Sequence, residues 1–338
     1  MTRLWADTLQ VPSTLAAALR GTDGIGAVAD RLTHASTKRI VISGNGAAWY
    51  AGMSIWLASL EPRPVSAEIV CVPGGLLARG RFAWRPGDLL FAVSSSGEFR
   101  DVIEAIQAPG APPVVAVTAN AGSTIGLASS ARAVIELPAG AAFTHSSAYT
   151  ANVAVGLAIL ARAAADPGLL EAVAGLPDAA NVAVRDAAEW AVAEVIGAAR
   201  PRFVLGIGDG PAWAAGLEMA LLAREVGCRP AEGVELREGA TSSMFGVGPG
   251  DLALIAEVGR PESEGAILES EAEESLRDRG ANVVRLPGGR LGDRRPRLAQ
   301  TLGRGGARGR RPRVADGARG GRGFRGRPGR DPARRPDH

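Results

Sequence analysis

The sequence predicts an α/β fold of two tandem units, each a parallel sheet flanked by helices in a doubly wound, flavodoxin-like arrangement, followed by a disordered basic tail. Three observations support this prediction. Strand-like and helix-like segments alternate along the chain, two blocks of sequence recur at one offset, and the composition changes abruptly after residue 287. Alternating strands and helices are typical of βαβ units in a parallel sheet covered on both faces.

The first unit is expected at residues 24–166, after an N-terminal helical segment at 1–23. Its strands are short apolar or β-branched runs, and its helices carry apolar residues at helical spacing. The expected strands are 39–44, 65–72, 88–94, 113–120 and 131–137. The expected helices are 47–61, 99–108 and 148–165. Aromatic residues make up only 4% of the chain, so Ala, Val, Leu and Ile must build the core.

The chain then repeats itself. The segment RIVISGNGAAWYAG from Arg39 matches RFVLGIGDGPAWAAG from Arg202. Further on, PGDLLFAV from Pro86 matches PGDLALIA from Pro249, and both matches have an offset of 163 residues (39 to 202, 86 to 249). A period this long indicates a duplicated domain, because solenoid repeats run to roughly 20–50 residues. We therefore expect a second unit at 167–287, incomplete because the pattern stops after the strand GANVVRLP.

Charge separates the folded part from the tail. Residues 288–338 hold 16 Arg and 4 Asp, a net charge of 16 − 4 = +12. The whole chain has a net charge of +3, so residues 1–287 carry 3 − 12 = −9. The tail has almost no periodic apolar pattern, so it cannot bury enough surface to offset its ordering entropy, and we expect disorder. Segments such as FRGRPGR resemble RNA-binding arginine–glycine tails. A GC-rich gene read out of frame gives the same composition, and we favour this frameshift interpretation, so a nucleic-acid partner is not expected.

The sequence excludes several other classes of protein. No run of 18 or more apolar residues appears, and the first twenty residues include Asp7 and Gln10, where a signal peptide needs an unbroken apolar stretch. Cys71 and Cys228 lie far apart with no CxxC, so neither a disulfide framework nor a zinc site is indicated. We expect a cytoplasmic protein with no membrane partner, no metal and no cofactor.

The stretch FAVSSSGEFRDVIEAI suggests a binding site. It places Ser94, Ser95, Ser96 and Gly97 between a buried strand and a helix. Backbone N–H groups at a helix N-terminus carry partial positive charge, serine hydroxyls add donors, and glycine lets the backbone approach a ligand closely. A phosphate fits that description. The alternative is that Ser96 is an ordinary N-cap and its neighbours are turn residues.

Two further turns strengthen the phosphate interpretation. The first, SGNGAAW, contains Gly44, Asn45 and Gly46, and the second, THSSAYT, contains His145, Ser146 and Ser147. Three glycine- or hydroxyl-rich turns at strand ends suit one small anionic ligand in a switch-point crevice. A dinucleotide is not expected, because Trp49 follows the GxG and no acidic residue is well placed for a ribose.

Together, the SSSGE strand–turn–helix, the strand–GNG–helix and the duplication resemble the sugar isomerase (SIS) domain family, over about residues 24–287. The arrangement is similar to the two-SIS isomerase half of glucosamine-6-phosphate synthase, without its glutamine-hydrolysing domain, and to sugar-phosphate isomerases and amino-sugar-phosphate deaminases. The resemblance implies that Ser94, Ser95 and Ser96 bind a sugar phosphate, with the Gly44–Gly46 turn closing the other side. It also implies a homodimer.

The resemblance also suggests catalytic residues. Aldose–ketose interconversion needs a base that moves a proton between C1 and C2 through an enediol. The carboxylate that matches the family's base is Glu225, on the helix after the second glycine-rich turn, with Glu218 and Glu232 as competitors.

A second acid/base must open the sugar ring, and the family uses a histidine in a turn that here reads LREGATSS. Glu238 stands in its place. It could act as acid/base if burial or Glu235 raised its pKa, or it could simply pair with Arg237. His145, in the hydroxyl cluster, is the other candidate.

Three functions therefore stay open. The leading one is a phosphosugar aldose–ketose isomerase or an amino-sugar-phosphate deaminase/isomerase that acts through an enediol or enediolamine. A phosphosugar-binding sensor is second, because the family's histidine and C-terminal lysine have no counterpart; Lys38 is the chain's one lysine. Nucleic-acid binding through the tail is third.

Overall fold

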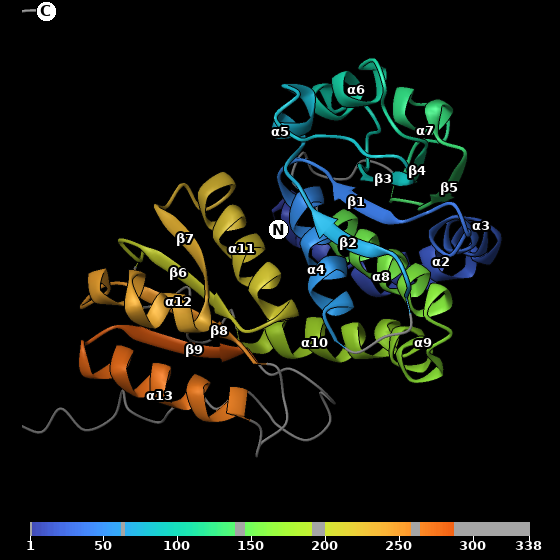
Figure 1. Cartoon of the computed structure of the whole chain (residues 1–338). Helices are drawn as coiled ribbons and strands as arrows, with labels where there is room; N and C mark the ends of the chain where they lie inside the picture. The colour runs from blue at the N-terminus through green and yellow to red at the C-terminus, as the bar shows by residue number, and fades with distance from the viewer. Residues whose placement is uncertain (1, 62–64, 139–145, 191–199, 258–263, 287–338) are drawn as a thin grey trace, which may run out of the picture. The chain divides into compact units, whose positions relative to one another are not determined.

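The computed structural model describes residues 2–61, 65–138, 146–190, 200–257 and 264–286, all within one compact unit of residues 1–298 (Figure 1). These residues form two parallel sheets, each flanked by helices, and the predicted fold class is confirmed. No helix in the described ranges combines the length and the apolar character needed to cross a bilayer. The predicted tail at 288–338 lies outside the described residues.

The first sheet has five parallel strands in the order β2-β1-β3-β4-β5. They are β1 (Arg39–Ser43), β2 (Glu68–Cys71), β3 (Asp88–Val93), β4 (Val114–Thr118) and β5 (Ala131–Val134). This is the flavodoxin-like order, in which β2 lies on one side of β1 and β3, β4 and β5 follow in turn on the other. The carboxyl ends of β1 and β3 are neighbours at the switch point, and all five predicted strands are present.

Successive side chains of a strand point to opposite faces of the sheet. Both faces of this sheet carry apolar side chains, and helices cover both. Ile40 and Ile42 of β1 belong to a core built with α3 (Thr22–Leu32), α4 (Ala47–Ser59) and α8 (Ser146–Ala163). Val41, between them, belongs to a second core with α5 (Gly74–Ala78), α6 (Arg100–Gln107) and α7 (Thr124–Ala128). The three predicted helices correspond to α4, α6 and α8.

Further helices surround the first sheet. They are α1 (Arg3–Thr8), α2 (Val11–Arg20), α9 (Pro167–Ala174) and α10 (Leu176–Trp190). Val11 and Leu15 of α2 pack with Ala154 of α8 and with Leu176 and Ala180 of α10. Helix α10, which follows the first unit in sequence, therefore packs against the N-terminal helices.

The second sheet repeats the order of the first with one strand fewer, as β7-β6-β8-β9. Its strands are β6 (Val204–Gly208), β7 (Ala231–Glu235), β8 (Leu252–Ala256) and β9 (Asn282–Leu286). The accompanying helices are α11 (Pro211–Glu225), α12 (Leu236–Thr241), the 3₁₀ helix η2 (Ser243–Gly246) and α13 (Glu264–Asp278). Strand β9 corresponds to the predicted strand GANVVRLP.

The repeat in the sequence is also a repeat in conformation. Gly46 precedes α4 with φ 55° and ψ −132°, and Gly210 precedes α11 with φ 50° and ψ −130°. An ion pair joins the first and third strand segments of each sheet. In the first it connects Arg39 Nη2 with Asp88 Oδ2 at 2.6 Å, and in the second Arg202 Nη2 with Asp251 Oδ2 at 3.1 Å.

Candidate functional site

Two of the predicted turns lie side by side at the switch point of the first sheet. Ser43 of β1 is paired in register with Ala92 of β3. The turns that follow, Gly44–Gly46 and Ser94–Gly97, therefore leave the same edge of the sheet. They approach closely, because a Cβ at Gly44 would lie 2.8 Å from the carbonyl oxygen of Val93. Glycine at position 44 is what allows this contact.

Ser94 and Gly97 shape the serine turn. Ser94 is buried, and its Oγ accepts a hydrogen bond from the Gly97 N–H at 3.0 Å. Gly97 has φ of +68°, and a Cβ there would lie 1.9 Å from Ser123 Oγ. Only glycine fits position 97, for reasons of both backbone conformation and space.

Ser95 and Ser96 supply the donors of this turn. Within the described ranges, neither their backbone N–H groups nor their hydroxyl hydrogens have a hydrogen-bond acceptor. Ser96 is exposed and Ser95 is half-buried. Two N–H groups and two hydroxyls just before the N-terminus of α6 form an arrangement that suits an anion.

Glu98 connects the serine turn to the loop after β4. Its carboxylate accepts hydrogen bonds from the backbone N–H and from the hydroxyl of Thr124, each at 2.8 Å. The backbone bond first, and then the hydroxyl bond, lower the pKa of Glu98 below its ordinary value. Glu98 therefore positions the turn and does not itself present a donor to a ligand.

Replacing Glu98 with Gln is expected to destabilise the protein in a pH-dependent way. A carboxyl with a lowered folded pKa adds stability above its unfolded pKa and loses it as the pH falls through the folded pKa. The difference in Tm between wild type and E98Q should therefore shrink below about pH 4. Thermal melts across this range test the prediction, with T124V as a smaller, matched perturbation. A difference that stays constant with pH would contradict it.

The glycine turn after β1 contributes backbone, not side chain. Gly46 has φ of +55°, and a Cβ there would meet no atom of the described residues within 4 Å. The side-chain Nδ2 of Asn45 donates to Asp101 Oδ2 at 2.9 Å. Asn45 thus braces the turn against the first turn of α6.

Ser146 and Ser147 are bonded to the N-terminal helix α1. Asp7 accepts hydrogen bonds from the backbone N–H of Ser147 at 3.0 Å and from its hydroxyl. The Thr8 hydroxyl donates to Ser146 Oγ at 3.3 Å. The Ser147 hydroxyl, expected to bind phosphate, thus donates to Asp7 instead, whereas Ser146 accepts a hydrogen bond and keeps its own hydrogen. His145, the neighbouring candidate, lies outside the described residues.

Helix α8 contributes a residue that the sequence patterns do not single out. Asn152 is 1% exposed, and its Nδ2 donates to Ser95 Oγ at 2.8 Å. The signal that could have found it is an amide within the apolar run ANVAVGLAIL, because a buried polar group needs a partner.

The candidate carboxylates Glu218 and Glu225 lie about two turns apart on α11. Glu218 is 4% exposed, and neither of its carboxyl oxygens has a hydrogen-bond partner among the described residues. Burial, and secondly the charge of Glu225, raise the pKa of Glu218 to about 7. Glu225 is the last residue of α11 and is exposed. Two carboxyl groups on one helix therefore differ in environment.

Stability is expected to fall as the pH rises through the titration of Glu218. Its folded pKa of about 7 exceeds the ordinary value of 4.5, so the folded state favours the protonated form. This contribution is full below the unfolded pKa and is lost as the pH rises through the folded pKa. Urea unfolding from about pH 5 to about pH 8 should show that the free energy of unfolding declines in wild type and not in E218Q. The exposed Glu232, changed to Gln, is the matched control, and an equal effect of both variants would contradict the prediction.

Glu238 lies exposed on α12. Its backbone N–H donates to Glu235 Oε2 at 2.8 Å, so Glu235 caps this helix. Arg237 forms its ion pair with Glu264, and the alternative pairing with Glu238 is not observed. The Glu238 side chain is thus accessible to solvent.

Comparison with known proteins identifies the fold. No protein-family model and no curated protein sequence matches the chain. A protein assigned as a phosphosugar isomerase from Silicibacter pomeroyi DSS-3 matches with a TM-score of 0.70 and 23% identity, over 85% of this chain and 87% of that one. The C-terminal domain of glucosamine-fructose-6-phosphate aminotransferase from Francisella tularensis matches with a TM-score of 0.68 and 16% identity, over 86% and 90%. Tagatose-6-phosphate ketose/aldose isomerase from Escherichia coli matches with a TM-score of 0.66 and 18% identity, over 84% of this chain and 81% of that one.

The chain has the double-SIS fold. The expected resemblance is confirmed at the level of architecture, and the two parallel sheets are the centres of the two SIS units. The serine turn belongs to the first SIS unit, at the end of β3.

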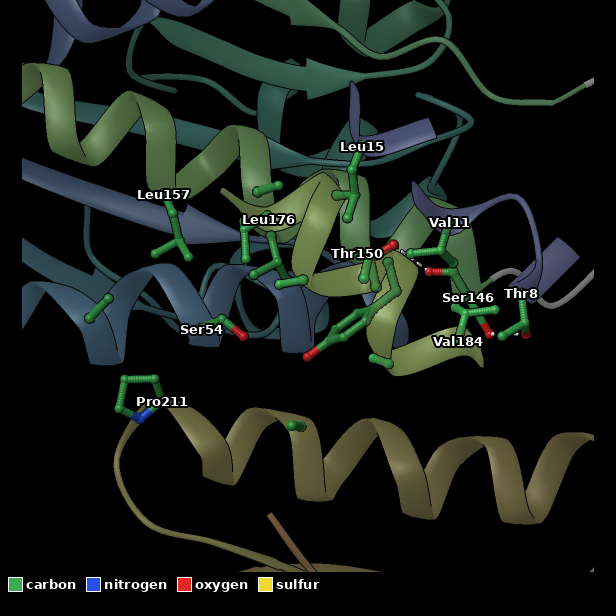
Figure 2. A pocket seen from close by; sticks show the side chains of 18 of the residues that line it. Thr8, Val11, Leu15, Ser54, Ser146, Thr150, Leu157, Leu176, Val184 and Pro211 are labelled. Atoms are coloured by element: carbon green, nitrogen blue, oxygen red, sulfur yellow. Dashed lines mark hydrogen bonds between the residues drawn. The ribbon is translucent and has the colours of Figure 1, made fainter. Parts of the chain in front are cut away.

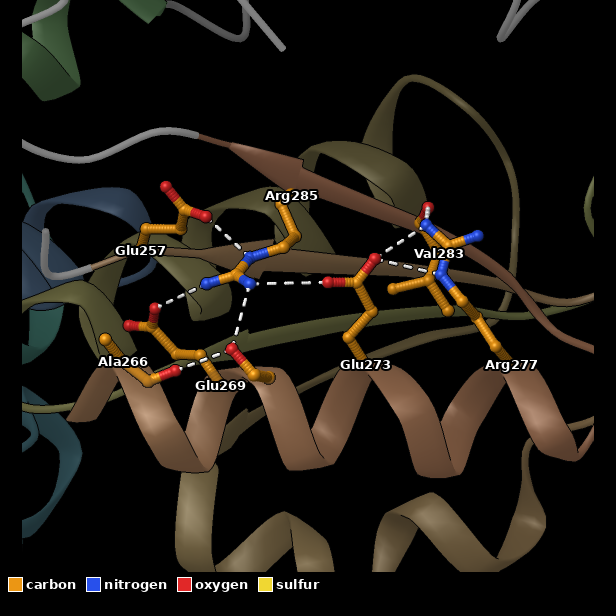
Figure 3. A network of polar contacts seen from close by, with 8 residues as sticks. Glu257, Ala266, Glu269, Glu273, Arg277, Val283 and Arg285 are labelled. Atoms are coloured by element: carbon orange, nitrogen blue, oxygen red, sulfur yellow. Dashed lines mark hydrogen bonds and ion pairs between the residues drawn. The ribbon is translucent and has the colours of Figure 1, made fainter. Parts of the chain in front are cut away.

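The second SIS unit has an ion-pair network where the first has the serine turn. Glu257 follows β8 as Ser94 follows β3, with the offset of 163 residues (94 to 257). Its carboxylate pairs with Arg285 Nε at 2.5 Å, and Arg285 also contacts Glu269 and Glu273 of α13 at 3.1 and 3.3 Å (Figure 3). Carboxylates repel a phosphate, so the first SIS unit holds the better anion site.

A cavity of about 760 Å³ lies elsewhere, among the helices around the first SIS unit (Figure 2). Its walls are mainly apolar side chains of α2, α8 and α10, with Ser54 of α4 and Pro211 of α11 at one side. None of the side chains described in its walls comes from the serine turn or the glycine turn. An apolar lining does not suit a phosphate.

Proposed function

We propose that this protein binds a sugar phosphate at the Ser94–Gly97 turn and acts as an aldose–ketose isomerase or amino-sugar-phosphate deaminase. The observation that carries the proposal is the set of donors on Ser95 and Ser96 at the switch point that have no acceptor among the described residues. A phosphate monoester presents three terminal oxygens that accept such hydrogen bonds. Solved structures with the same fold are named for phosphosugar chemistry.

Proton transfer in this proposal is assigned to the carboxylates of α11. Isomerisation through an enediol needs a base at C1–C2, and groups whose environments separate their pKa values can divide acid and base roles. Glu225 is our candidate base because it is exposed, whereas Glu218 is buried and its pKa is raised to about 7 by desolvation and by the charge of Glu225. Helix α11 packs on α4, whose N-terminus carries the glycine turn, through Ala214 against Met53 and Leu57.

Ring opening needs a second acid/base. The exposed Glu238 remains our candidate for this step, with His145 as the alternative. The turnover of variants E238Q and H145A should be compared on open-chain sugar phosphates and on cyclic sugar phosphates, whose ring must open first. A defect confined to cyclic substrates would identify the ring-opening group.

Binding is tested by the thermal shift of the full chain with fructose 6-phosphate, glucosamine 6-phosphate and the unphosphorylated sugars. At 100 times the dissociation constant, a ligand stabilises the folded state by about 2.7 kcal/mol. We expect this shift with the phosphosugars alone. It should shrink in S96A and persist in S13A, a matched exposed serine on α2. No shift with any sugar phosphate, or equal shifts in both variants, would exclude the site.

Turnover separates the enzyme from a pure binding protein. NMR can follow fructose 6-phosphate and its aldose, and an ammonia assay can follow glucosamine 6-phosphate. E225Q should keep the phosphosugar shift and lose turnover by about 100-fold or more, as expected for a general base. Wild-type binding without turnover would instead support a sensor.

One observation favours that second candidate. His34 and Lys38 lie before β1, at the amino edge of the sheet, whereas the serine turn leaves its carboxyl edge. The Lys38 Nζ donates to the Ala35 carbonyl at 2.9 Å, and His34 Nδ1 lies 2.7 Å from Ser36 Oγ. Within the described residues, neither an imidazole nor a lysine amine is therefore available to a sugar at the switch point.

A further inference from the structure

We infer that Asn152 of α8 is a positioning residue, which fixes the Ser95 hydroxyl as a hydrogen-bond donor toward a bound phosphate. The inference rests on the proposed phosphate site and names a residue that orients it. Its basis is the bond between Asn152 Nδ2 and Ser95 Oγ, 2.8 Å long and partly buried.

The direction of this bond determines what Ser95 can do. An amide nitrogen only donates, so the Ser95 oxygen is the acceptor and keeps its own hydrogen for another partner. In the part of the chain that the structure describes, no acceptor for that hydrogen is present. The Ser95 hydroxyl thus enters the site as a donor, which is the polarity that a phosphate oxygen requires.

The surroundings hold Asn152 in place. Its side chain is 1% exposed, and the neighbouring Ala151 and Val155 of α8 are buried in the core of the first SIS unit. The start of α8 is fixed by Asp7, which accepts hydrogen bonds from Ser147. Asn152 therefore reaches Ser95 from a rigid helix, and the hydroxyl is oriented before a ligand arrives.

The other atom of the amide supports the same orientation. Asn152 Oδ1 is buried without a hydrogen-bond partner in the described structure. Turning the amide over would satisfy Oδ1 but would leave the NH₂ group buried without an acceptor. Unpaired buried donors are rarer than unpaired carbonyl oxygens, which favours Nδ2 toward Ser95. Orienting a donor in advance reduces the entropy cost of binding.

A double-mutant cycle tests the inference. Isothermal titration of the full chain with fructose 6-phosphate and glucosamine 6-phosphate compares wild type, N152L, S95A and the double variant. N152L should weaken binding about fivefold to tenfold, the effect of one hydrogen bond. In the S95A background the same change should have no further effect, because the hydroxyl that Asn152 orients is gone. T150V, on the same helix, should bind as wild type does, because the Thr150 hydroxyl donates to the carbonyls of Ser146 and Ser147 within that helix.

N152D provides a second, independent variant. A carboxylate accepts the Ser95 hydrogen and adds negative charge beside the phosphate, so N152D should lose more affinity than N152L. If N152L without ligand melts at a lower temperature than wild type, the binding of N152D compared with that of wild type becomes the test. Additive effects of N152L and S95A, or equal binding by wild type and N152D, would overturn the positioning role and leave the phosphate site intact. Absence of sugar-phosphate binding in wild type would overturn both.

Discussion

Replacing Arg39 with alanine is expected to lower the free energy of unfolding by about 3–5 kcal/mol, the usual cost of breaking a buried ion pair from one side. Arg39 Nε and Nη2 donate to the two carboxyl oxygens of Asp88 at 2.9 and 2.6 Å, and both residues are buried. The guanidinium also stacks over the ring of Phe82, 4.7 Å from its centroid. Alanine would leave the Asp88 carboxylate buried with one backbone donor, the Arg85 N–H.

The duplicated ion pair provides a matched control. Arg202 and Asp251 occupy the corresponding positions, but the Arg202 side chain is 69% exposed against 8% for Arg39. Asp251 is as buried as Asp88 and would keep the Gly248 N–H as a donor, but water already screens the exposed Arg202, so R202A should cost less than R39A. Urea unfolding of both variants measures the difference. Equal losses in the two variants would show that burial does not set the strength of these ion pairs. The double variant R39M/D88L should recover much of the stability that R39A loses.

Replacing Gly97 with alanine is expected to destabilise the protein by about 2–5 kcal/mol and to abolish phosphosugar binding. The left-handed conformation costs a non-glycine residue about 1–2 kcal/mol, and overpacking adds about 1–3 kcal/mol. Here φ is +68°, and the new Cβ would lie 1.9 Å from Ser123 Oγ and 2.5 Å from its Cβ. Relief of this clash must move the turn that holds Ser95 and Ser96.

Gly110 separates the two causes. It has φ of +78°, but a Cβ there would meet nothing within 4 Å. G110A should therefore cost only the conformational term, about 1–2 kcal/mol, and leave binding unchanged. G97A/S123G removes the steric conflict and should recover part of the stability. Equal losses in G97A and G110A would mean that Ser123 yields without cost.

The sequence by itself determined the sheets and where their turns fall. Short apolar runs separated by helical periodicity reveal strands, because each residue's burial repeats with the local geometry. The offset between Arg39 and Arg202 revealed the duplication, and SSSGE marked the turn after β3. These signals are local in the chain or a direct comparison of two segments, so one sequence suffices to read them.

Only the tertiary structure decided which side chains meet. Asn152 reaches Ser95 across 57 positions, and Asp7 reaches Ser147 across 140. No periodicity encodes such pairs. From the sequence, Ser147 is therefore predicted as a phosphate ligand although its hydroxyl donates to Asp7 of α1, and Asn152 is only one polar residue in an apolar helix. Burial likewise separates Glu218 from Glu225, because the pKa of a carboxyl depends on the desolvation and charge around it, which packing alone creates.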